Sequence, residues 1–338
     1  MLLSELTAST RRLALVGLAK NTGKTVALTA LLRELEAQGR RVGVTSVGRD
    51  GEERDVIDAR IEKPRVRLAA GSLVATTDAL LRDSGLPYDL LEETGVRTPI
   101  GRVLVARLSG DGTIELAGPS AAADVRAVAD AMLAHGAEQA LIDGAVDRRA
   151  ASSPDVADGL VTATGAVLDT DIAEVVARTC DAVELTRLPG VDEAYRSAPA
   201  VERVSLPPRF ALTAEAGRIA RLLAENPDAR WLIVAGALPE RFLADLLAPV
   251  RKLGRELTVV VSDPTHVFLG GHGPGWYRRQ GILLRTLERI RLEAITVNPV
   301  APRSHWFDSA QLRELLREAI PDVPIFDVLA HEYTQAPL

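Results

Sequence analysis

Residues 17–25 read Gly-Leu-Ala-Lys-Asn-Thr-Gly-Lys-Thr, and they constrain the fold more than any other segment. An apolar run at 13–16 precedes them, and a helical pattern of apolar residues begins at Lys24. A strand, a glycine-bearing loop and a helix in this order form a cradle for phosphates, because backbone N–H groups and the positive end of the helix face the anion. The segment therefore predicts an α/β fold with a nucleoside triphosphate at this loop.

Lysine usage supports this interpretation. The chain has 40 Lys plus Arg, yet only Lys20, Lys24, Lys63 and Lys252 are lysines. Two of the four lie in the nine-residue loop, where a compact ammonium suits a phosphate better than a guanidinium does. We expect Lys24 to reach the β- and γ-phosphates of ATP and the Thr25 hydroxyl to bind Mg²⁺. The other residues expected to bind the nucleotide in this loop are Gly17, Lys20, Asn21, Thr22 and Gly23. The alternative is a glycine-bearing turn that ends in Gly-Lys-Thr by chance.

Composition excludes several other classes. The net charge is −6 and no basic stripe is evident, so no nucleic-acid partner is expected. The sequence shows no secretory signal, and no apolar run approaches the roughly 20 residues that cross a bilayer. We therefore expect a cytoplasmic protein without a membrane partner.

The single cysteine, Cys180, is interpreted as a small buried apolar residue. The histidines show no zinc-binding spacing.

Strand and helix patterns alternate along most of the chain, which predicts a mainly parallel sheet with helices on both faces. Strands are expected at 42–47, 103–108, 113–116, 140–142, 160–168, 231–237, 257–261, 294–297 and 323–328. Helices are expected at 24–36, 121–134, 172–183, 214–224, 240–253, 278–291 and 309–319. The turn residues at 109–112 predict a β-hairpin insertion between 103–108 and 113–116.

Length predicts about two domains. A proline-bearing segment at 197–208 interrupts the pattern. The expected regions are a nucleotide-binding region over 1–196 and a second α/β region over 197–338, which can continue the first sheet.

Polar residues stand where strands are expected to end, and ligands of open α/β sheets bind there. Asp143 follows a short apolar run and is expected to hold the Mg²⁺ shell, although a strand-end carboxylate can also simply cap a turn. Asp50 lies in an acidic loop and is expected to bind Mg²⁺ or orient water, the alternative being a solvated charge run. Asn298 is a candidate for base reading or a plain Asn-Pro turn.

Three further segments are interpreted mainly as structural or solvated. Asp263-Pro264 and the glycine-rich run 270–275 are expected to be turns, with a lid as the alternative. Arg148 and Arg149 are interpreted as a solvated pair, with charge stabilisation at the γ-phosphate as the alternative.

The loop departs from the strict P-loop pattern, because Leu18 stands where the first glycine belongs and Gly17 precedes it. A Gly-x5-Gly-Lys-Thr loop is similar to that of dethiobiotin synthetase, a member of the SIMIBI class of P-loop proteins. Together with 45–52, 142–150, 158–166 and 297–302, the loop resembles the P-loop subunit of the lysine 5,6-aminomutase reactivase. That resemblance implies ATP-driven exchange of damaged cobalamin, with a second reactivase ATPase subunit and the aminomutase as partners. It places Asn298 where SIMIBI proteins often read the base.

Two other functions stay open. One is an ATP-dependent carboxylate ligase of the dethiobiotin synthetase type, in which a lysine follows the second strand; the segment 44–48 has no lysine. The other is a nucleotide-dependent interaction module without useful turnover. No asparagine is followed by lysine, so the Asn-Lys-x-Asp guanine-reading motif is absent and ATP is favoured over GTP.

Overall fold

The computed structural model describes residues 2–48, 65–144, 149–302 and 304–327. The chain forms two compact units, of which unit 1 comprises 1–177 with 291–338 and unit 2 comprises 178–290. The expected division at 196/197 differs from this one. The reason is that the strands at 291–298 and 325–326 pair in the sheet of unit 1, so the carboxyl-terminal part continues the first sheet.

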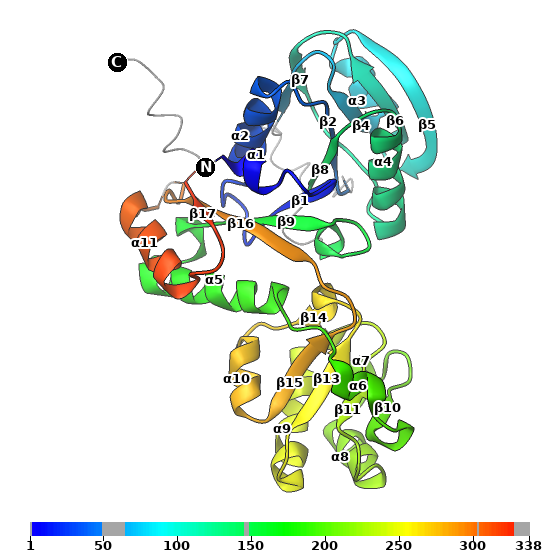
Figure 1. Cartoon of the computed structure of the whole chain (residues 1–338), viewed down its shortest axis with the longest axis vertical. Coiled ribbons are helices and arrows are strands. Elements are labelled where there is room, and N and C mark those ends of the chain that lie inside the picture. Colours follow the sequence, from blue (N-terminus) through cyan, green and yellow to red (C-terminus); the bar gives the residue numbers. More distant parts are fainter. Residues whose placement is uncertain (1, 49–64, 145–148, 303, 328–338) are drawn as a thin grey trace. The chain divides into compact units, whose positions relative to one another are not determined.

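Unit 1 is built on a nine-stranded sheet in the order β17-β16-β9-β1-β8-β2-β4-β6-β5. The strands from β17 to β4 run parallel, whereas β6 pairs antiparallel with both of its neighbours, β4 and β5. The mainly parallel α/β fold is therefore confirmed (Figure 1). The bounds are β1 Arg12–Gly17, β2 Val42–Ser46, β4 Leu73–Thr77, β5 Tyr88–Thr98, β6 Gly101–Leu108, β8 Gln139–Asp143, β9 Gly159–Gly165, β16 Arg291–Asn298 and β17 Ile325–Phe326.

An antiparallel hairpin is present and contains the strand expected at 103–108, but its partner is not the one expected at 113–116. β6 pairs with β5, and the strand after 109–112, β7 (Gly112–Ile114), pairs with β3 (Val66–Leu68) in a separate small sheet. The turn residues at 109–112 therefore end β6 and redirect the chain, while the hairpin turn lies at Pro99-Ile100. The eleven-residue β5 is polar and lies at the sheet edge, so its weak alternation gave no strand signal.

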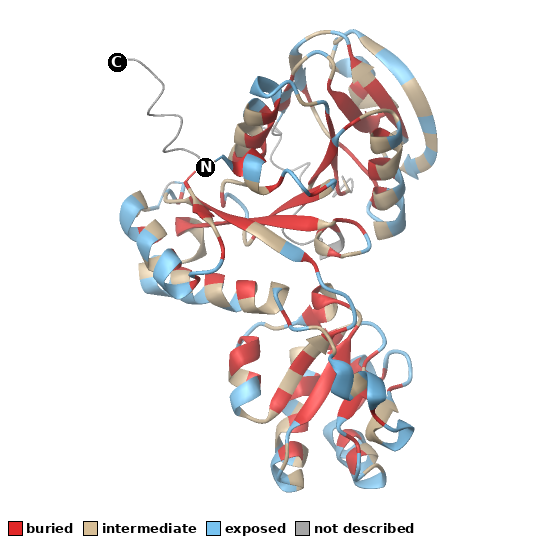
Figure 2. Ribbon diagram, in the orientation of Figure 1, coloured by how far each residue is buried: buried red, intermediate tan, exposed pale blue. Residues whose placement is uncertain are grey.

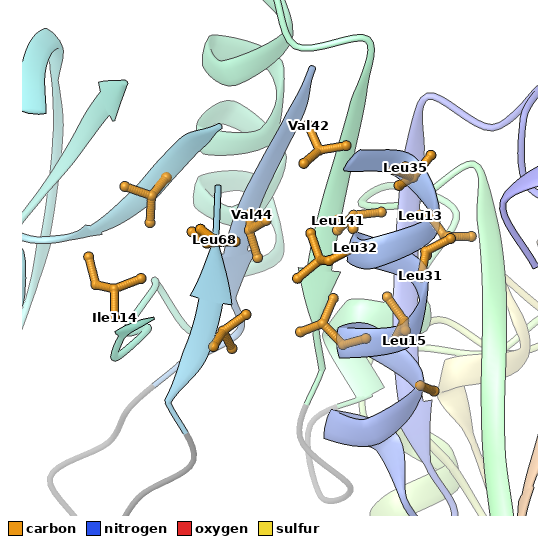
Figure 3. Close-up of a cluster of buried hydrophobic side chains, with 14 of the residues drawn as sticks. Leu13, Leu15, Leu31, Leu32, Leu35, Val42, Val44, Leu68, Ile114 and Leu141 are labelled. Atoms are coloured by element: carbon orange, nitrogen blue, oxygen red, sulfur yellow. The ribbon is translucent and has the colours of Figure 1, made fainter. Parts of the chain in front are cut away.

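Helices cover both faces of this sheet. Leucines of α2 (Lys24–Ala37) pack against Leu13, Val44 and Leu141 in the main core cluster (Figure 3). On the opposite face, Gly43 of β2 lies against Met132 of α4 (Ala122–Ala134), where an added Cβ would lie 2.8 Å from its sulfur. The remaining helices of unit 1 are α1 Leu3–Leu6, α3 Asp78–Asp83 and α11 Ser309–Ala319, and α5 Ile172–Thr186 runs across the unit boundary.

Unit 2 has a four-stranded parallel sheet in chain order, β10-β11-β13-β15, and a parallel two-stranded pair, β12-β14. Its core contains apolar residues of α8, α9 and α10 packed on these strands. Figure 2 shows the buried strands of both units. The bounds are α6 Glu193–Ser197, β10 Arg203–Ser205, α7 Phe210–Thr213, α8 Ala216–Glu225, β11 Trp231–Ile233, β12 Leu238–Pro239, α9 Glu240–Leu253, β13 Leu257–Val261, β14 Val267–Phe268, α10 Pro274–Arg279 and β15 Ile282–Thr286.

The helix expected at 278–291 is wrong. Gly281 has a left-handed backbone (φ 85°) that ends the preceding helical turn, and residues 282–286 then alternate between buried and half-buried positions as β15. Among the described residues, no helix is long and apolar enough to cross a membrane.

Candidate functional site

The predicted phosphate loop connects β1 to α2. Four buried apolar residues, 13–16, form the strand, and Asn21 (φ 66°) and Gly23 (φ 86°) supply the left-handed turns that lead into the helix. Gly23 is the N-cap and has no side chain with which to cap the helix. The first N–H groups of α2 are therefore not capped by an N-cap side chain. Uncapped N–H groups at the start of a helix can bind an anion.

The other predicted loop residues support the turn. Thr22 is buried, and its hydroxyl donates to the carbonyl of Ala19 over 3.0 Å. Gly17 ends the buried strand, and the next N–H, that of Leu18, donates to Ala163 of β9. Lys20 is exposed. Thr22 and Gly17 thus shape the loop, and Lys20 is placed at the surface.

Asn298 of β16 braces the loop from the neighbouring part of the sheet. Its Nδ2 donates to the carbonyl of Asn21 over 2.9 Å, and its Oδ1 accepts from the N–H of Val300 over 3.1 Å. The contact is close: a Cβ on Gly23 would lie 3.0 Å from the Cβ of Asn298. Both polar ends of the amide are engaged in this arrangement. Base reading by Asn298 stays a prediction.

Lys24 and Asp143 form an ion pair at the start of α2. The Lys24 Nζ lies 2.5 Å from the Asp143 Oδ1, and each side chain is 19% exposed. Asp143 ends β8, which pairs directly with β1 in the register Leu15↔Asp143. The next residue must be glycine, because a Cβ on Gly144 would lie 2.7 Å from that of Ala151. The expected role of Asp143 in holding the Mg²⁺ shell stays a prediction.

The oxygen groups at this point suit Mg²⁺. Thr25, the second residue of α2, and Asp143 supply a hydroxyl and a carboxylate, and Mg²⁺ prefers few protein oxygens together with phosphate and water. Within the described part of the chain, no three His, Cys, Asp or Glu side chains gather as a metal cage. The donor set therefore fits a metal that arrives with a nucleotide. Asp50 and Arg148 lie outside the described residues, as does the side chain of Arg149.

Sequence reasoning missed one residue at this site. Ser46, the last residue of β2, is paired in register with Asp143 and is buried. Its position as a polar residue at a strand end was the available signal. The role of binding Mg²⁺ or orienting water was instead assigned to Asp50 in the acidic loop that follows this strand.

The carboxyl ends of the strands in unit 2 are occupied by structural hydrogen bonds. Asp263 accepts from the N–H of Thr265 over 2.8 Å, as expected for a turn. Glu240 accepts from the N–H groups of Gly270, Gly271 and His272 and from the Tyr277 hydroxyl. Burial acts to raise the pKa of Glu240, but these four donors outweigh it and hold the pKa below its usual value.

Comparison with known proteins gives little. No family model matches this chain, and no curated protein matches it. A solved structure described as "Structure of pNOB8 ParA bound to nonspecific DNA" aligns over 96% of this chain and 99% of its own, at 11% identity and a TM-score of 0.26. A similarity at this level carries no conclusion about function, so the site must be interpreted from its own geometry.

Proposed function

We propose that unit 1 binds Mg-ATP at the loop 17–25. One observation carries the proposal: the helix end without a side-chain cap at Gly23 lies beside an internal Lys24–Asp143 ion pair. An ammonium placed at a helix N-terminus after a glycine-bearing loop is the phosphate-binding arrangement of P-loop proteins. The absence of a guanine-reading motif favours ATP over GTP.

The ion pair gives the site an exchange mechanism. In the structure, the Asp143 carboxylate neutralises the Lys24 ammonium. When phosphates bind, Lys24 turns to them and the Asp143 carboxylate is released from the ion pair. Thr25 and Asp143 would hold the Mg²⁺, which supplies charge neutralisation at the phosphates when it is bound. The chain's own residues thereby exchange one charge pair for another as the nucleotide binds.

We further propose slow hydrolysis that a protein partner accelerates. Lys24 is the cation that the contact with Asp143 places at the phosphate cradle, and hydrolysis also needs charge neutralisation at the γ-phosphate and a positioned water. The sequence resemblance supports a cobalamin-dependent aminomutase and a second reactivase subunit as the partners. The role proposed for this chain is that of a reactivating chaperone.

Calorimetry with Mg-ATP tests the binding site. Lys24→Ala should weaken ATP binding by roughly tenfold or more, because charge-assisted hydrogen bonds to phosphate are lost. Lys252→Ala is the matched control, since Lys252 is an exposed lysine of unit 2. Equal affinity of Lys24→Ala and the parent protein would refute the site.

Turnover assays test the role. ATP hydrolysis should be slow alone and should rise with the aminomutase and the second reactivase subunit. Rapid turnover that requires only a small amine or carboxylate would instead identify a ligase of the dethiobiotin synthetase type. ATP binding without stimulated turnover would identify an interaction module.

A further inference from the structure

The last residue of β2 brings a hydroxyl to the base of the phosphate loop. Ser46 lies opposite Asp143 in the parallel register, and such strands are about 4.8 Å apart. Both side chains point to the face that α2 covers, because Val44 and Leu141, two residues earlier in each strand, pack in the core beneath that helix (Figure 3). The Ser46 hydroxyl therefore lies on the side of the sheet where Lys24 contacts Asp143.

This hydroxyl is buried without a hydrogen bond. Ser46 is 6% exposed, and its Oγ has no partner within the described ranges. A buried donor without a partner is rare in native proteins, because its lost hydration is not compensated. An unsatisfied hydroxyl beside a charged pair indicates that its partner is provided in another state of the site.

Main-chain contacts fix Ser46 in place. The N–H of Val47 donates to the carbonyl of Asp143 over 2.9 Å, which ties the ends of β2 and β8 together. Gly118 packs so closely on Ser46 that an added Cβ would overlap the Ser46 carbonyl oxygen. The position of the hydroxyl is thus set by the backbone and does not depend on a hydrogen bond of its own.

We propose that Ser46 is a positioning residue for Asp143, an inference that rests on the proposed binding of Mg-ATP. When Lys24 turns to the phosphates, the Asp143 carboxylate loses the ammonium that contacts it in the nucleotide-free protein. The Ser46 hydroxyl then donates to that carboxylate and holds it toward the water shell of the metal. Rotation about a single side-chain bond of Ser46 is sufficient for this change.

The test compares ATP affinity with and without Mg²⁺. In the parent protein, the ratio of the two dissociation constants measures how much Mg²⁺ tightens binding. Ser46→Ala should reduce this ratio roughly tenfold or more, the effect expected for one hydrogen bond to a charged carboxylate. Affinity for ATP in EDTA should not change, because Ser46 does not contact the nucleotide in this proposal.

Thermal unfolding without nucleotide provides a second readout, in which losing the hydroxyl is not expected to weaken the protein. Since the hydroxyl has no partner in that state, Ser46→Ala should leave the melting temperature unchanged or raise it. Ser46→Thr keeps the hydroxyl and should retain the Mg²⁺ effect. Thr162→Val is the matched control: its hydroxyl is also buried without a partner, and it points to the opposite face from Val161, which packs beneath α2.

The outcomes separate this inference from the proposed function. An unchanged Mg²⁺ ratio in Ser46→Ala overturns the positioning role even if ATP binds through Lys24. A large loss of folding, or an equal loss of affinity with and without Mg²⁺, shows a purely structural hydroxyl and also overturns it. Failure of the Lys24→Ala test removes the proposed function itself, before Ser46 is considered.

Discussion

Replacing Asn298 with alanine distinguishes a residue that braces the phosphate loop from one that reads the base. The side chain donates one hydrogen bond to the carbonyl of Asn21, at an exposed position. Such a bond contributes about 0.5–1.5 kcal/mol net, which corresponds to about a 2- to 12-fold change in affinity. Because the contact is to the loop that is proposed to bind phosphates, the loss should apply to any ligand that carries a triphosphate.

The assay compares ATP, GTP and inorganic tripolyphosphate by competition in Mg²⁺ buffer. If Asn298 braces the loop, Asn298→Ala weakens all three by the same factor, since tripolyphosphate has no base. Asn226→Ala is the matched control, because the Asn226 amide also donates one hydrogen bond to a backbone carbonyl, that of Leu222 in α8 of unit 2. A variant that loses affinity for ATP but keeps it for tripolyphosphate would refute the bracing role and establish base reading.

Three further predictions concern the ion pair, a close packing position and the carboxylate of unit 2. Asp143→Asn should tighten ATP binding in EDTA, because Lys24 no longer has to leave a carboxylate, while Mg²⁺-dependent hydrolysis falls; calorimetry and phosphate release measure both. Gly144→Ala should destabilise unit 1 by about 1–3 kcal/mol through overpacking, whereas Gly217→Ala, with open space and a helical position, should not; thermal melts decide. Glu240→Gln should lower stability by about 1 kcal/mol at pH 7. Since the folded pKa of Glu240 is lowered, that difference should vanish as the pH falls from above 4.5 through the folded value, which denaturant titration at several pH values would show.

The sequence was most informative where function depends on local structure. The strand, loop and helix around Lys24 could be predicted because each is specified by a few adjacent residues, and Asp143 could be placed at the carboxyl end of a strand because it directly follows a short apolar run. The hydrogen bond from Asn298 to Asn21 could not be predicted, because it joins residues 277 positions apart. Which strands are neighbours is decided by the packing of the whole sheet.

The wrong assignments have the same cause. The turn at 109–112 was recognised, but turn residues do not specify which strands pair across them. β6 pairs with the polar strand that precedes it, β5. The short strand β15 was interpreted as helix because leucines and isoleucines fit both periods over five residues. Ser46 was missed since only its register with Asp143 makes it notable.

The insertion of unit 2 between β9 and β16 separates the loop 17–25 from Asn298, the residue that braces it, in the order of synthesis. β1, α2 and β8 are synthesised before the chain leaves unit 1 at 177, so Lys24 and Asp143 are already part of the nascent chain when unit 2 begins. Asn298 lies on β16, which the ribosome delivers only after the whole of 178–290 has emerged. The hydrogen bond from Asn298 to the loop at Asn21 can therefore form only after the whole of unit 2 has been synthesised.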